Sequence, residues 1–104
     1  MKKLKAHGDL LHTAAIVCSH VATGQRKILV ADRGAPEDPA DSGWQFLCGA
    51  EIEDWEQASV WSVQEVIDVE PTLASLVNMS IGTRLMRLSQ NDEWVELPGE
   101  SETH

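Results

Sequence analysis

Residues 41–49, Asp-Ser-Gly-Trp-Gln-Phe-Leu-Cys-Gly, constrain the fold more than any other part of this chain. Asp and Ser side chains can hydrogen-bond to their own backbone, and Gly adopts torsion angles that other residues avoid. Residues 41–43 are therefore predicted to form a turn of fixed geometry. After this turn, bulky apolar residues occupy alternate positions, namely Trp44, Phe46 and Cys48. This alternation predicts a strand with one buried face, at the centre of a small sheet.

Four further runs have the β-branched and apolar composition of strands. They are residues 14–19, 27–32, 83–88 and 93–97. The first two are expected to pair as a hairpin through the turn at residues 23–25, and the last two as a hairpin with a four-residue loop. Pro, Gly and acidic residues make 33–40 a predicted loop, and residues 59–61 read as a short bridge.

The segment Val63 to Asn78 has the pattern of two helices separated by a proline. Ser62 and Glu65 have the spacing of a capping box, in which each side chain bonds the other residue's backbone amide. Pro71 cannot continue the first helix but suits the first turn of the next. We expect this helix–Pro–helix unit to cover one side of the sheet.

The order of these elements predicts an α+β fold with a mostly antiparallel sheet of about five strands. A chain of 104 residues has room for one domain, which we place at residues 14–97. Residues 1–13 are expected to be a flexible lead-in, and residues 98–104 a disordered acidic tail. No run approaches the roughly 20 apolar residues of a membrane span, so the expected location is the cytoplasm.

The charges of the chain are unevenly distributed. The net charge is -9, and residues 34–83 contain ten Asp or Glu residues and no Lys or Arg. Such a segment cannot neutralise itself locally and should present a negative field. Nucleic acid is not expected as a ligand, because phosphate binding needs clustered cations. A basic protein is the expected partner.

The acids that follow Gly49 are the best candidates for a docking surface, because complementary charge speeds association and filters wrong partners. Trp55 lies among them and is expected to anchor the interface, where Trp is enriched. The predicted partner-binding residues are Asp41, Glu51, Glu53, Asp54, Trp55 and Glu56. Two structural alternatives stay open. The acidic run can be a solvated face, and Trp55, like Trp61, can simply cap a sheet edge.

The sequence contains few residues in patterns that indicate catalysis or metal binding. The phosphate-binding, nucleophile-elbow and zinc-protease motifs are absent, so neither enzyme activity nor a cofactor is predicted. Cys18 and His20 point the same way if they lie on a strand, and Cys48 can lie near them. Zinc normally takes three or four such ligands, so this is a weak signal and no metal is predicted. Both cysteines are expected to pack as small apolar groups, and a bridge between neighbouring strands is the alternative in an oxidising compartment.

The central motif resembles that of the immunity protein 33 family, small bacterial proteins associated with toxin systems. The matching residues are Asp41, Ser42, Gly43, Trp44, Gln45 and Phe46, followed by Gly49 and Glu51. The similarity extends to residues 30–33 with Pro36, and it covers about residues 14–97. The resemblance implies a cytoplasmic antidote that binds and blocks a toxin, and it brings no catalytic residues. The alternative is a binding or regulatory module of the same fold that is not linked to a toxin.

Overall fold

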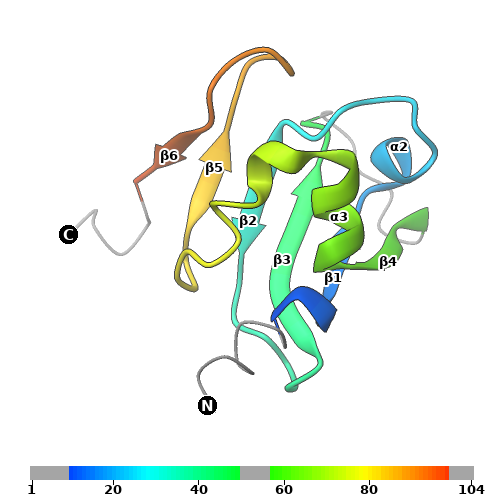
Figure 1. The fold of residues 1–104 in the computed structure, drawn as a ribbon, viewed down its shortest axis with the longest axis vertical. Coiled ribbons are helices and arrows are strands. Elements are labelled where there is room, and N and C mark those ends of the chain that lie inside the picture. Colours follow the sequence, from blue (N-terminus) through cyan, green and yellow to red (C-terminus); the bar gives the residue numbers. More distant parts are fainter. Residues whose placement is uncertain (1–9, 50–56, 99–104) are drawn as a thin grey trace.

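The computed structural model describes residues 10–49 and 57–98, and its sheet with its covering helices is drawn in Figure 1. Residues 10–12 are helical and precede the first strand. The strands are β1 (Ala14–Val17), β2 (Val30–Arg33), β3 (Asp41–Leu47), β4 (Ser59–Ser62), β5 (Arg84–Met86) and β6 (Val95–Leu97). The helices are α2 (Ser19–Ala22), α3 (Val63–Val69) and the 3-10 helix η2 (Pro71–Leu73). No helix within the described ranges is long and apolar enough to cross a membrane.

The strands form one mixed sheet in the order β4-β1-β3-β2-β5-β6. β1 and β3 are parallel, and every other neighbouring pair is antiparallel. The predicted α+β fold with a mostly antiparallel sheet is confirmed, and β3 is an interior strand as expected. The sheet has six strands and not about five, because residues 59–61, predicted as a short bridge, pair with β1 together with the N-cap residue Ser62.

The predicted hairpin between residues 14–19 and 27–32 is wrong. β3 lies between β1 and β2 in the sheet, and the chain leaves β1 through the short helix α2. A turn at residues 23–25 could have joined two adjacent antiparallel strands, but the helix carries the chain away from the edge of β1. β2 then pairs with β3 and β5. The predicted pairing of the last two strands is confirmed, but residues 87–94 separate them, so the connection is longer than the four residues expected.

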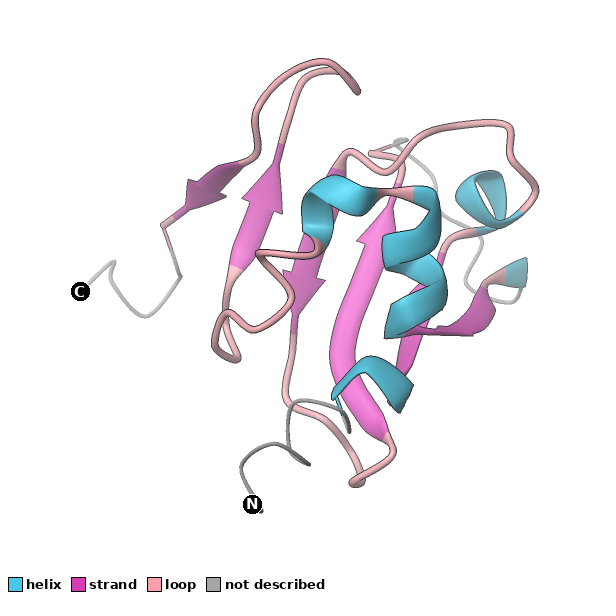
Figure 2. Cartoon of the chain, viewed as in Figure 1, coloured by secondary structure: helices cyan, strands magenta, loops and turns pink. Residues whose placement is uncertain are grey.

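The capping box at the start of α3 forms as predicted. The Glu65 amide donates to Ser62 Oγ at 3.1 Å, and the Ser62 amide donates to Glu65 Oε1 at 2.8 Å. Pro71 ends this helix and opens η2, which is a single 3-10 turn and not a second α-helix. In Figure 2 these two helices lie across one face of the sheet.

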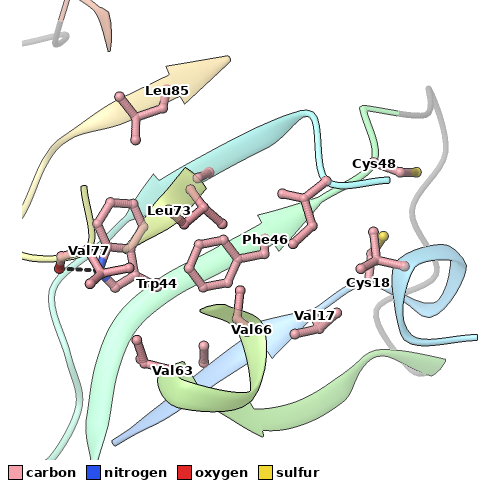
Figure 3. Packing of buried hydrophobic residues seen from close by; sticks show 14 residues of the cluster. Val17, Cys18, Trp44, Phe46, Cys48, Val63, Val66, Leu73, Val77 and Leu85 are labelled. Carbon is pink, nitrogen blue, oxygen red and sulfur yellow. Dashed lines mark hydrogen bonds between the residues drawn. The ribbon is translucent and has the colours of Figure 1, made fainter. Parts of the chain in front are cut away.

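The core lies between that face and the helices (Figure 3). Trp44 and Phe46 are buried and stack with their ring centroids 5.5 Å apart. Val63 and Val66 of α3 and Leu73 of η2 pack over them. Leu10 and Leu11, within the segment predicted as a lead-in, also pack against this core.

Candidate partner-binding surface

The Asp-Ser-Gly segment is part of β3 and forms a bulge in it. β1 residues 14 and 16 pair with β3 residues 41 and 45, so three residues of β3 stand opposite one of β1. Gly43 makes this possible with a φ of +86°. A Cβ atom added to Gly43 would lie 2.0 Å from the carbonyl oxygen of Gly34, so any other residue would clash with the backbone. The predicted isolated turn is thus a kink within the strand.

Side chains of the same segment fix the loop at residues 34–40. Both carboxylate oxygens of Asp41 accept backbone hydrogen bonds, from the amide of Gly43 at 2.9 Å and from that of Glu37 at 3.1 Å. Ser42 Oγ donates to the carbonyl of Ala14 at 2.7 Å and accepts from the amide of Trp44. Asp41 and Ser42 therefore hold the loop, the bulge and β1 together.

Trp44 and Arg33 connect this motif to the helical layer. Trp44 Nε1 donates to the carbonyl of Val77 at 2.9 Å, shown as the dashed line in Figure 3. Arg33 donates to the carbonyls of Ser42 at 2.9 Å and Met79 at 2.8 Å, with its guanidinium 5.8 Å from the Trp44 ring centroid. The motif thus links the central strand to the chain that follows η2.

The two faces of the sheet differ because the described helices gather on one of them. Strand register places one cross-strand row on the opposite face, running through all six strands as Val60, Ile16, Gln45, Asp32, Arg84 and Leu97. A second row on that face is apolar and holds Leu47, Val30, Met86 and Val95. Val60 and Val95 are 67% and 56% exposed. Apolar residues in such rows are suited to contact with another protein.

A groove of about 400 Å³ joins this open face to the loop at residues 34–40. We call it the acidic groove. Its lining includes Ile16, Gln45 and Val60 together with the acids Glu37, Asp38 and Asp41. Among its lining residues there is no Lys or Arg, so the groove combines apolar side chains with carboxylates that no basic side chain of the lining neutralises.

Cys18, His20 and Cys48, the weak metal candidate of the sequence, come together in the structure. The ligand atoms of the three side chains all lie within 4.8 Å of one another. Cys48 Sγ is 3.5 Å from His20 Nδ1. Both cysteines are buried and not joined by a disulfide, while His20 is partly exposed.

The family model of the Imm33 immunity protein domain matches residues 15–98. This chain belongs to the Imm33 family. No curated protein and no solved structure matches it. The match runs from the second residue of β1 to just past β6, so nearly the whole described sheet, and with it most of the acidic groove, lies in the Imm33 domain.

The structure places only one of the predicted partner-binding residues of this Imm33 chain. Asp41 is half-buried and lines the acidic groove. The other five, Glu51, Glu53, Asp54, Trp55 and Glu56, lie outside the described residues. Trp61 faces the helical side of the sheet and packs against the core, so it is not an exposed anchor.

Two features of the Imm33 chain were not predicted from its sequence. Glu37 and Asp38 were assigned to a loop on composition, and only the fold brings them beside Ile16 and Val60. Arg87 is 3% exposed, although arginine is rarely buried. The signal that could have revealed it is that Arg87 directly follows β5 and continues its alternation, two residues after the buried Leu85.

Proposed function

We propose that this Imm33 chain is an immunity protein that binds a cognate bacterial toxin inside the producing cell and blocks it by occlusion. The family match over residues 15–98 is the observation that carries this proposal. Occlusion requires a stable complex and no chemical step, which agrees with the lack of catalytic motifs in the sequence.

The acidic groove is the docking surface in this proposal, and its occupant is a basic segment of the toxin. Glu37, Asp38 and Asp41 supply charge complementarity, which guides approach and orientation. Ile16 and Val60 supply the apolar contact that the centre of an interface needs.

The residues that follow β3 extend this surface in our proposal. Glu51, Glu53, Asp54 and Glu56 would enlarge the negative field, and Trp55 would act as the anchor. Because a toxin that acts on nucleic acid needs cations at its active face, an acidic inhibitor can cover that face directly.

The test pairs the groove variant E37K/V60K with the control L88K/E93K. Each adds the same charge and replaces one exposed apolar residue and one exposed acid, but the control sites lie at the β5–β6 end of the sheet. Binding to the product of the neighbouring reading frame is measured by calorimetry, and protection by growth of cells that express both proteins.

The groove variant is expected to raise Kd at least about tenfold, a loss of 1.4 kcal/mol, and to weaken protection. The control should bind and protect like the natural chain. Equal binding by both variants would overturn the groove as the docking surface. Growth that is the same with and without this chain, while the neighbouring product is toxic, would overturn the immunity role itself.

A further inference from the structure

Cys18, His20 and Cys48 converge at one end of the parallel strand pair. β1 ends at Val17 and β3 at Leu47, so each strand is followed at once by a cysteine. The amide of Cys18 donates to the carbonyl of Phe46 at 3.1 Å, which keeps the two strand ends side by side. Figure 3 shows both cysteines at the same end of the core, away from Trp44. His20 comes from α2, which begins directly after Cys18.

The three side chains form a donor set suited to a thiophilic metal ion. Two thiolates and one imidazole are ligands that Zn²⁺ takes in proteins. Bonds of about 2.3 Å to sulfur and about 2.1 Å to nitrogen place two ligand atoms of a tetrahedral ion roughly 3.6 Å apart. The separation of 3.5 Å between Cys48 Sγ and His20 Nδ1 already has this value. The other ligand atoms lie no more than 4.8 Å from one another, so small side-chain rotations would bring them to the distances of a tetrahedral site.

The surroundings of the cluster place backbone amides beside one sulfur and leave the histidine partly exposed. Burial raises the pKa of the Cys18 thiol above its ordinary value, and the backbone amides of Val21 and Cys48 oppose this rise only in part. These amides point partial positive charge toward the sulfur and would stabilise it as a thiolate once an ion is bound. The partial exposure of His20 gives an ion a route from solvent.

We propose that Cys18, His20 and Cys48 bind one Zn²⁺ ion, with solvent in the fourth position. On binding, the two thiols lose their protons, the neutral imidazole contributes a nitrogen lone pair, and two protons leave for each ion bound. The ion would tie α2 and the end of β1 to the end of β3. This inference does not depend on the proposed toxin.

Cobalt substitution tests the site directly on the full chain, without an affinity tag and under a reductant that does not bind metal. Co²⁺ added to the metal-free protein is expected to give a thiolate-to-cobalt charge-transfer band that saturates at one equivalent. Zn²⁺ should then abolish the band by displacing the cobalt. Calorimetry of Zn²⁺ binding in buffers of different ionisation enthalpy should report the release of two protons per ion.

The variant H20Q tests the ligand set with little risk to the fold, because His20 is not in the buried core. Mutations of groups that only support a metal ligand cost 10–100-fold in affinity, so loss of the ligand itself should weaken Zn²⁺ binding at least about 100-fold. C48S should remove part of the charge-transfer intensity. H12Q is the matched control, since it removes an exposed histidine from the helical turn before β1 and should leave Zn²⁺ binding unchanged.

Several results would overturn the proposal. One is the lack of a stoichiometric charge-transfer band in the reduced protein. Another is Zn²⁺ affinity in H20Q equal to that of H12Q. If mass spectrometry shows a Cys18–Cys48 disulfide in the protein as isolated and the reduced protein binds no Zn²⁺, the pair is a redox couple and not a metal site.

Discussion

Gly43 is the residue on which the path of the central strand depends. It combines a φ of +86° with a backbone approach that leaves no room for a side chain. Asp41 and Ser42 then close the bulge with hydrogen bonds to the neighbouring backbone. The Asp-Ser-Gly-Trp pattern of this chain therefore has a structural explanation, residue by residue.

The first prediction compares two glycines. Gly24 has nearly the same φ, +82°, but a Cβ atom there would meet nothing within 4 Å. Gly24→Ala should cost about 1–2 kcal/mol from the left-handed conformation alone. Gly43→Ala should cost at least about 2 kcal/mol more, because the added methyl group forces the backbone apart. Urea unfolding of both variants measures the difference, and equal losses would show that the clash at Gly43 is relieved without cost.

At the scale of elements, a buried ion pair joins the helical layer to the last hairpin. Arg87 Nη2 is 2.7 Å from Glu70 Oε1, and Arg87 also donates to the carbonyls of Ile28 and Gln90. Its guanidinium lies 4.4 Å from the ring centroid of Trp94. Burial alone would raise the pKa of Glu70, but hydrogen bonds from Arg87 and Thr72 outweigh it, so this pKa lies below its usual value.

The second prediction concerns this pair. Glu70→Ala leaves the Arg87 charge buried without its partner and should cost about 3 kcal/mol at neutral pH. A carboxyl group with a lowered folded-state pKa stabilises the protein above its unfolded pKa, about 4.3, and loses this effect as pH falls through the folded value. The difference between the natural chain and Glu70→Ala, measured by urea unfolding, should therefore shrink at about pH 3.

Asp32→Ala provides the contrast. The Asp32–Arg84 pair is exposed, with side-chain exposures of 30% and 46%, so its loss should cost less than about 1 kcal/mol. A loss as large as that of Glu70→Ala would contradict the assignment of the buried pair as the stronger one.

The third prediction is local to α3. Ser62→Ala removes the acceptor for the Glu65 amide and should cost about 1 kcal/mol. Ser75→Ala, at an exposed position after η2, should leave the thermal midpoint nearly unchanged. Equal effects of the two variants would mean that the capping box contributes nothing measurable.

Prediction from sequence succeeded where the information was local. The capping box of Ser62 and Glu65 and the alternation of Trp44 and Phe46 each depend on a few neighbouring residues, and both were found. Pairing between distant strands could not be predicted, because the parallel pairing of β1 with β3 produces no local sequence pattern in either strand. β4 was not predicted as a strand because four residues are too few to show an alternation of apolar and polar positions.

For the candidate site, the sequence shows how many acidic residues there are but not where the fold places them. The acids of residues 34–83 were counted correctly, yet the fold assigns those that it describes to different tasks. Glu65 caps α3 and Glu70 pairs with Arg87. Only Glu37, Asp38 and Asp41 border the acidic groove, because that grouping depends on the bulge and loop.

At the scale of the whole molecule, the fourth prediction tests whether the location of charge matters for the proposed binding of a toxin. The variant E51K/E53K/E56K reverses three acids after β3, and D92K/E93K/E96K makes the same change in charge around the β5–β6 hairpin. The first should slow association with the toxin, most strongly at low ionic strength, where screening is weakest. The second should leave the association rate closer to that of the natural chain. Stopped-flow kinetics at several salt concentrations would distinguish them, and equal slowing would mean that only net charge matters.

The place of β1 in the sheet has a consequence for how the chain is made. Both neighbours of β1, β3 and β4, come later in the sequence. During translation β1 therefore leaves the ribosome before either of its partner strands has been made. It can pair first with β3, and the edge strand β4 is added later. Translation that stops before residue 41 therefore yields a peptide that cannot form this pairing, because both neighbours of β1 are still missing.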